Sequence, residues 1–157
     1  MLRTHQRVFV FGLGPSTSLV DQLEIRLTRF ARHVIPLRTS GQELLEPLLL
    51  MNKEDLVIAI GFFKENPSLH MVLEQANKHE TPVIFITDTL GPLLGDKAAV
   101  TLSARRGPVS SFHSLTIPMT IINALLLALS SVDQENVMGT LDRLDNLRDR
   151  FRRHNGS

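Results

Sequence analysis

Short apolar runs alternate along the chain with longer segments of helical periodicity. Continuous apolarity, rather than strict alternation with polar residues, is typical of strands that are covered on both faces. Strands that alternate with helices predict strand–helix–strand crossovers, and therefore an α/β fold with a parallel sheet. The predicted strands are Arg7–Phe11, His33–Leu37, Asp55–Ile60 and Pro82–Ile86, with a weaker fifth at Ala99–Leu102.

Three segments between these runs have the spacing of helices. Residues 16–32 place apolar side chains on one helix face, and residues 42–51 do the same with leucines and a proline that predicts a kink. The third helix is expected to begin at Asn66–Pro67, because Asn is a favoured N-cap and Pro a favoured first helical residue, and to reach about Lys78. In the second helix the inward residues are expected to be Leu44, Leu45, Leu48 and Leu49.

Two further helices are predicted near the C-terminus. The apolar segment 117–129 is too short for a membrane span, which takes about 20 residues, and its apolarity on every face predicts burial between the sheet and a subunit partner. Ser114 is a candidate cap for this helix, with Pro118 near its first turn. Residues 133–153 form a narrow apolar seam among arginines and aspartates, which favours a solvated face over DNA binding. The seam consists of Val137, Leu141, Leu144, Leu147 and Phe151.

Composition narrows the function classes. The chain has 157 residues, 43% of them apolar, which is the size of one domain with a real core. It has no cysteine, which excludes thiol catalysis, thiolate-bound zinc and disulfides and fits a reducing compartment. The 17 Lys and Arg against 16 Asp and Glu argue against nucleic-acid binding by the whole surface. The histidines lack metal-ligand spacing and the N-terminus lacks a signal segment, so we expect no metal, no cofactor and a cytoplasmic location.

Candidate binding residues lie directly after the apolar runs, because parallel α/β sheets bind ligands beyond the carboxyl ends of their strands. After the first run, Gly12 and Gly14 permit close backbone approach, and Ser16 and Ser18 place hydroxyls at a helix start. The free N–H groups of a helix start predict an anion or phosphate site. Ser18 also has the spacing of a capping box with Asp21, which is a purely structural alternative.

The chain lacks the motifs that identify a dinucleotide site, a nucleotide-phosphate loop or a serine hydrolase. Thr17 occupies the place of the third glycine of a dinucleotide fingerprint, and neither a Walker loop nor a Gly-x-Ser-x-Gly elbow occurs. A solvated pair of Lys64 with Glu65, and bonding of Asp88 to local backbone, are structural alternatives for the later loops. The remaining candidate ligand-binding residues are Lys64, Asn66, Thr87 and Ser114.

The order of these motifs resembles the SIS (sugar isomerase) domain, and most closely the effector domain of RpiR-type bacterial transcriptional regulators. The resemblance covers Arg7 to Val132 and implies a three-layer αβα sandwich with a five-stranded parallel sheet, flavodoxin-like and doubly wound. It divides the chain into a SIS domain, 1–132, and a C-terminal amphipathic helix and tail, 133–157, that packs on the domain or on a partner subunit. The similar segments are Gly12-Leu13-Gly14-Pro15-Ser16, the Asp-led run 55–60, the run 83–88 ending in Thr-Asp, and Ser111-Phe112-His113-Ser114.

The resemblance also implies a function. It predicts a non-catalytic sensor that binds a sugar phosphate or related anionic sugar near Gly14, Ser16, Lys64 and Thr87, forms a dimer or tetramer, and reaches DNA only through a helix-turn-helix domain. No such domain precedes Val8, so we expect an excised effector domain, with a natural single-domain protein as the alternative.

One loop departs from the family pattern. Residues 61–66, Gly-Phe-Phe-Lys-Glu-Asn, lack the hydroxyls of the family's phosphate cradle, so either Lys64 supplies charge in their place or the ligand is changed or lost. Two other functions therefore stay open. One is a sugar-phosphate aldose–ketose isomerase in which Glu65 moves a proton and His113 assists ring opening. The other is a ligand-free dimerisation module with Phe62 or Phe63 plugging the site.

Overall fold

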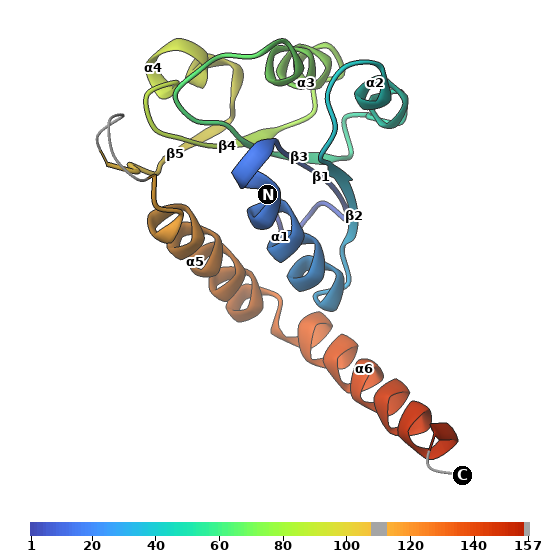
Figure 1. The fold of residues 1–157 in the computed structure, drawn as a ribbon. Helices are drawn as coiled ribbons and strands as arrows, with labels where there is room; N and C mark the ends of the chain where they lie inside the picture. The colour runs from blue at the N-terminus through green and yellow to red at the C-terminus, as the bar shows by residue number, and fades with distance from the viewer. Residues whose placement is uncertain (108–112, 156–157) are drawn as a thin grey trace.

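A parallel sheet forms the centre of the protein (Figure 1). The computed structural model describes residues 1–107 and 113–155. The five strands lie in the order β2-β1-β3-β4-β5, which is the flavodoxin-like, doubly wound order. The predicted fold class is therefore confirmed, and each predicted run forms a strand with bounds within one residue of those expected. The strands are β1 (Arg7–Gly12), β2 (His33–Leu37), β3 (Leu56–Ile60), β4 (Val83–Thr87) and β5 (Val100–Ser103).

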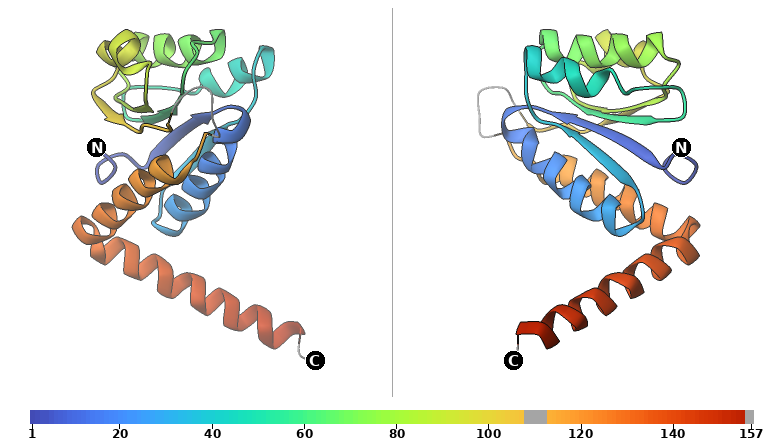
Figure 2. Two further views of the ribbon diagram at one scale, coloured as in Figure 1. Left: turned by 60° about the vertical axis from the view of Figure 1, so that its left-hand side comes forward. Right: turned by 90° about the vertical axis from the view of Figure 1, so that its right-hand side faces the viewer.

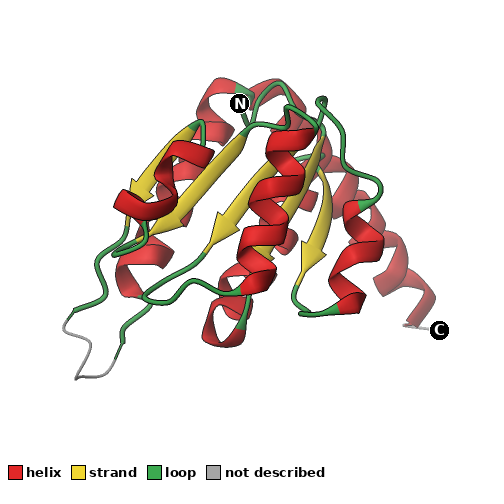
Figure 3. Ribbon diagram, turned by 90° about the horizontal axis from the view of Figure 1, so that it is seen from above, coloured by secondary structure: helices red, strands yellow, loops and turns green. Residues whose placement is uncertain are grey.

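Helices cover both faces of the sheet, which gives three layers (Figures 2 and 3). One face packs against α1 (Thr17–Arg29) and α5 (Thr116–Val132). The other packs against α2 (Gln42–Leu48), α3 (Pro67–Lys78) and α4 (Gly91–Leu94). The short turns η1 (Gly14–Ser16) and η2 (Gly95–Lys97) precede α1 and follow α4, and α6 (Gln134–Asn155) ends the described chain.

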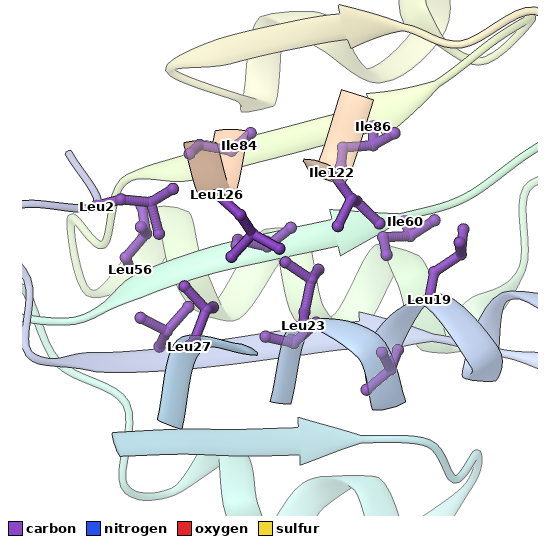
Figure 4. Close-up of a cluster of buried hydrophobic side chains, with 14 of the residues drawn as sticks. Leu2, Leu19, Leu23, Leu27, Leu56, Ile60, Ile84, Ile86, Ile122 and Leu126 are labelled. Carbon is purple, nitrogen blue, oxygen red and sulfur yellow. The ribbon is translucent and has the colours of Figure 1, made fainter. Parts of the chain in front are cut away.

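The continuous apolarity of the strands reflects two separate cores. Along β1, Val8 and Val10 belong to the cluster on the α1 and α5 side, whereas Phe9 and Phe11 belong to the cluster on the α2 and α3 side. All four are essentially inaccessible to solvent, so neither face of the strand tolerates a polar residue. Figure 4 shows the first cluster, in which leucines of α1 and apolar residues of α5 meet the side chains of β3 and β4.

One expectation about a helix face is wrong. In α2, Leu44 and Leu48 are buried as expected, but Leu45 and Leu49 are 44% and 79% exposed. The helix ends at Leu48 and is only seven residues long, so a single narrow face reaches the core. The short elements α4 and η2 were not predicted, because glycine and proline in this segment suggest a loop.

Within the single chain helix α5 is buried on one face, the side that packs on the sheet; the expected burial of its other side against a subunit partner stays a prediction. Leu126 and Leu129 are buried, whereas Leu127 and Val132 are 69% and 58% exposed. Pro118 lies in the first turn, as expected. The outer face of α5, where Leu127 and Val132 lie with the exposed Thr120 and Asn123, is therefore a partly apolar surface that the single chain leaves uncovered.

Helix α6 leaves the end of α5 at a bend of 101° and extends away from the sheet (Figures 1 and 2). Its first turns contact the domain through Val137, which is buried, while Leu147 and Phe151 are 58% and 68% exposed. Among the described residues no single helix has the length and hydropathy of a membrane span, and α5 and α6 meet that test only when taken together across the bend.

A buried ion pair fixes the junction of α5 and α6. Arg32 donates to Asp133 over 2.5 Å, and Asn136 donates to the other Asp133 oxygen over 2.7 Å. Both hydrogen bonds lower the pKa of Asp133, and the one from Arg32 has the larger influence. Arg32 lies just after α1, which ends at Arg29 and not at residue 32 as its periodicity suggested.

Candidate functional site

A cavity of about 310 Å³ lies at the carboxyl ends of β1 and β3. The strand order reverses between these two strands, and the crevice at such a point is where open α/β sheets bind ligands. A larger depression, about 560 Å³, surrounds the Arg7–Asp55 ion pair at the opposite, amino end of the sheet. The smaller cavity is lined by Phe11, Leu13, Pro15, Ser16, Ile60, Gly61, Phe62, Asn66, Arg106 and His113.

The turn after β1 brings the start of α1 to the cavity. A Cβ atom on Gly12 would lie 2.9 Å from Val20 Cγ2 and 3.1 Å from the Ser16 carbonyl oxygen, so glycine is what allows the helix to approach β1. Gly14 has a φ of +57°, which is the left-handed conformation that favours glycine. Ser16 occupies the N-cap position of α1, and its buried side chain makes no capping hydrogen bond and lines the cavity.

The two hydroxyls that follow Ser16 are used locally. Thr17 donates to the Gly14 carbonyl over 2.8 Å, and Ser18 donates to the Pro15 carbonyl over 2.9 Å. Ser18 lies inside α1, so the capping box that its spacing with Asp21 predicted does not form. Ser18 is also not among the residues that line the cavity.

The turn after β3 contains the start of α3. Asn66 caps this helix as predicted, accepting a hydrogen bond from the Leu69 amide over 2.8 Å, and it lines the cavity. Lys64 is exposed and is not one of the lining residues. The expected pair of Lys64 with Glu65 does not form, because Glu65 bonds to His70 over 2.6 Å.

The same turn places two aromatic rings beside the cavity. Phe63 has a φ of +62°, and the Lys64 amide donates to the Phe62 carbonyl over 2.8 Å, which closes a tight turn around Phe63. A bulky residue in this conformation is strained and needs support from its surroundings. Asp88 provides it, since its Oδ1 accepts hydrogen bonds from the amides of Phe63 (3.2 Å) and Thr89 (2.5 Å). The bond from Thr89 is the local role expected as an alternative for Asp88, whereas the bond from Phe63 joins Asp88 to the loop after β3.

Thr87, at the end of β4, is fully buried, and within the described part of the chain its hydroxyl has no hydrogen-bond partner. It is not among the cavity-lining residues. Ser114 is likewise outside the lining and accepts a hydrogen bond from the Thr116 amide over 3.1 Å, one residue before the N-cap position of α5, Leu115. Ser111 and Phe112, which belong to the segment similar to the family's last helix entry, lie outside the described residues.

Arg106, in the segment after β5, is a cavity residue that sequence reasoning missed. Its guanidinium carbon lies 3.9 Å and 4.5 Å from the ring centroids of Phe62 and Phe63. Its side chain is 8% exposed, and among the described residues its Nε has no hydrogen-bond partner. Burial lowers the pKa of Arg106, against an opposing contribution from Asp88. Inspection of the residues that follow the carboxyl end of β5, as was done for the other strands, would have found Arg106.

His113 lines the cavity beside these rings. Its ring centroid lies 4.3 Å from that of Phe63, and its Nδ1 is buried without a partner in residues 1–107 and 113–155.

The cavity thus combines the starts of two helices with one buried guanidinium. Helix N-termini carry partial positive charge, so together with Arg106 they favour an anion. The described residues contain no group of three His, Asp or Glu side chains that could hold a metal ion. Of the eight predicted ligand-binding residues, Ser16 and Asn66 line the cavity. Gly12 and Gly14 belong to the turn that contributes Leu13, Pro15 and Ser16 to the lining, and Ser18, Lys64, Thr87 and Ser114 are not lining residues.

Solved structures share this fold. The sugar isomerase domain of an RpiR transcription factor from Sphaerobacter thermophilus superposes with a TM-score of 0.83 at 21% identity, over 91% of this chain and 80% of that one. The Vibrio vulnificus NanR protein, solved with ManNAc-6P, gives 0.76 at 19% identity, over 93% of this chain and 56% of NanR. Phosphoheptose isomerase from Neisseria gonorrhoeae superposes with a TM-score of 0.62 at 14% identity, over 86% of this chain and 81% of the isomerase.

A comparison with curated protein sequences found no match. The family profile of the SIS domain matches residues 1–128, which is most of the chain and includes the whole sheet. The chain therefore belongs to the SIS domain family.

Proposed function

We propose that this chain is the ligand-sensing domain of an RpiR-type transcriptional regulator, and that it binds a sugar phosphate in the cavity between β1 and β3 without converting it. The observation that carries the proposal is the convergence of two helix starts, at Ser16 and Asn66, with the buried Arg106 on one cavity. A site of this kind recognises an anion, and its volume of about 310 Å³ is at the lower end of the range of small-molecule sites.

The similarities to solved structures support the same class of ligand. NanR was solved with ManNAc-6P, an amino-sugar phosphate. The structure from Sphaerobacter thermophilus is the sugar isomerase domain of an RpiR transcription factor. Phe62 forms one wall of the cavity but leaves an open space, and the polar residues Ser16, Asn66, Arg106 and His113 are part of its lining, which supports a sensor over a ligand-free dimerisation module.

The alternative of an aldose–ketose phosphate isomerase is supported by His113, whose buried Nδ1 has no partner among the described residues, and by the fold shared with phosphoheptose isomerase. Such a reaction needs a positioned base. Glu65, the base considered from the sequence, is 42% exposed at its side chain and is bonded to His70. This arrangement favours binding without catalysis.

We also propose that the domain works as a homodimer or tetramer in the cytoplasm and that DNA is contacted through a separate helix-turn-helix domain. The uncovered apolar face of α5, with Leu127, and the exposed seam residues Leu147 and Phe151 of α6 support a subunit contact. The division into a SIS domain, 1–132, and a C-terminal helix and tail, 133–157, is part of the same proposal.

Thermal unfolding and calorimetry with a panel of hexose phosphates and amino-sugar phosphates test the function. ManNAc-6P is the first probe, and N-acetylmannosamine without phosphate is its matched control. A ligand present at 100 times its Kd should stabilise the fold by about 2.7 kcal/mol. Binding with no conversion of the sugar in an NMR assay is the expected result. Conversion that is lost in Glu65→Gln would establish the isomerase instead, and no stabilisation by any phosphosugar would refute the sensor.

A further inference from the structure

The cavity holds a buried cation that is poor in hydrogen-bond acceptors. The Arg106 side chain is 8% exposed, and within the described residues its Nε donates to no acceptor. The nearest carboxylate oxygen, Asp88 Oδ2, lies 4.0 Å from that Nε, which is beyond hydrogen-bond distance. Burial of a charged guanidinium is costly unless its N–H groups are hydrogen-bonded. The Arg106 Nε–H group therefore lacks an acceptor, and a bound molecule could supply one.

The surroundings of Arg106 restrict which acceptor fits. Phe62 and Phe63 place their rings 3.9 Å and 4.5 Å from the guanidinium carbon, and such contacts are favourable for the cation. Rings do not accept the strong in-plane hydrogen bonds of the guanidinium edge. That edge matches two oxygens of one phosphate or carboxylate, which it binds bidentately.

We propose that Arg106 binds the phosphate group of the ligand, in the role that the sequence suggested for Lys64. This inference rests on the proposed function, which supplies the sugar phosphate. Arg106 lines the same cavity as Ser16 and Asn66, so the partial positive charge at the N-terminal ends of α1 and α3 adds to that of the guanidinium at one site. Lys64 is exposed and outside the cavity lining, so the charge that replaces the missing hydroxyls comes from the segment after β5 instead of the loop after β3.

Two substitutions separate the charge of Arg106 from its shape. Arg106→Met keeps a long apolar side chain against the two rings and removes the charge, while Arg106→Lys keeps the charge and removes the planar fork. Arg105→Met and Lys64→Met are matched controls, because both remove an exposed cation close in sequence to the site. Calorimetry with ManNAc-6P and with inorganic phosphate, at physiological salt, measures the effect.

We expect Arg106→Met to weaken binding of the sugar phosphate by about 10- to 100-fold, the loss typical of hydrogen bonds to a charged group. Arg106→Lys should recover part of this affinity. The control substitutions should change the Kd by less than about twofold, because exposed charges at this ionic strength are screened.

The NMR signal of the Arg106 Nε–H group, assigned through its loss in Arg106→Lys, gives a reading on the unaltered protein. It should move when inorganic phosphate or the sugar phosphate is added. A sugar phosphate that binds the unaltered protein and Arg106→Met equally well would overturn the role of Arg106 and leave the sensor function standing. A signal that moves with inorganic phosphate while no sugar phosphate binds would support the anion site and overturn the sensor. A signal that stays in place at saturating sugar phosphate would overturn the role of Arg106 even if Arg106→Met fails to fold.

Discussion

Arg106 Nε and Asp88 Oδ2 lie 4.0 Å apart in a setting where the two side chains are 8% and 5% exposed. The charges attract each other without a hydrogen bond, because the other Asp88 oxygen, Oδ1, is held by the amides of Phe63 and Thr89. Asp88 thus positions the aromatic turn, and its negative charge competes with any anion that approaches Arg106.

Replacement of Asp88 by asparagine should therefore strengthen anion binding. The side-chain carbonyl of Asn still accepts hydrogen bonds from the two amides, so the turn around Phe63 stays in place, while the competing charge is removed. We expect the Kd for ManNAc-6P to fall by about two- to fivefold in calorimetry, a change of the size of a modest, partly screened charge interaction. A weaker affinity in Asp88→Asn, with the fold intact by circular dichroism, would contradict this.

Gly12 controls the distance between β1 and α1. A methyl group at this position meets Val20 Cγ2 at 2.9 Å and the Ser16 carbonyl oxygen at 3.1 Å, so the helix start must shift. We expect Gly12→Ala to lower the free energy of unfolding by about 1–3 kcal/mol and to weaken ligand binding. Gly139→Ala is the control, because nothing lies within 4 Å of its added Cβ, and it should stabilise the protein by about 0.5–1 kcal/mol in urea unfolding. Equal stability of the two variants would argue against close packing at Gly12.

The Arg32–Asp133 pair should make stability depend on acid pH. Hydrogen bonds from Arg32 and Asn136 lower the pKa of Asp133 in the folded state, while the unfolded chain titrates near the ordinary value of about 3.9. The folded state therefore binds fewer protons than the unfolded state. The stabilisation is complete at pH values above the pKa of Asp133 in the unfolded chain, and it is lost as the pH falls through the lower pKa of Asp133 in the folded protein.

Asp133→Asn should accordingly be less stable than the unaltered protein at pH 7, by about 1–3 kcal/mol, and should lose less stability between pH 5 and pH 2. Urea unfolding at both ends of this range measures the difference. Asp142→Asn, at an exposed position of α6, is the control and should leave the slope unchanged. Parallel slopes for Asp133→Asn and the unaltered protein would show that the pair does not contribute to acid sensitivity.

The exposed seam of α6 should matter for assembly and not for the fold. Leu147 and Phe151 are 58% and 68% exposed, so their replacement by glutamine costs the single chain little. We expect the double variant to sediment at a lower mass than the unaltered protein while keeping its circular dichroism spectrum. Ile25→Gln, which removes a side chain that is 50% exposed on α1, should retain the assembly. An unchanged mass in the double variant would remove this part of α6 from the subunit contact.

The sheet could be predicted from the sequence because its strands are covered on both sides. Val8, Phe9, Val10 and Phe11 alternate between two cores, and this produces an uninterrupted apolar run with a sharp end at Gly12. Helix faces were harder to predict. Leu45 and Leu127 have the same chemistry as their buried neighbours, and which of them lies inward depends on the length of the helix and the elements beside it.

Only part of the site could be predicted, because residue type alone does not show which side chains point into the cavity. Ser16 and Asn66 follow from the rule that ligands bind beyond strand ends, and both line the cavity. Lys64 and Arg106 differ in a way that residue type does not reveal. The tight turn around Phe63 leaves Lys64 in solvent, while the aromatic rings of that same turn cover the guanidinium of an arginine more than forty residues later in the chain.

Arg32 gives α1 a second anchor, far from the cavity. Its guanidinium donates to the Leu2 carbonyl over 2.9 Å, to the Phe30 carbonyl over 2.9 Å and to Asp133 over 2.5 Å. One side chain thus tethers the N-terminal segment, the end of α1 and the start of α6 to a common point. A displacement of α1 would therefore either carry both of these segments with it or break hydrogen bonds of a buried charge.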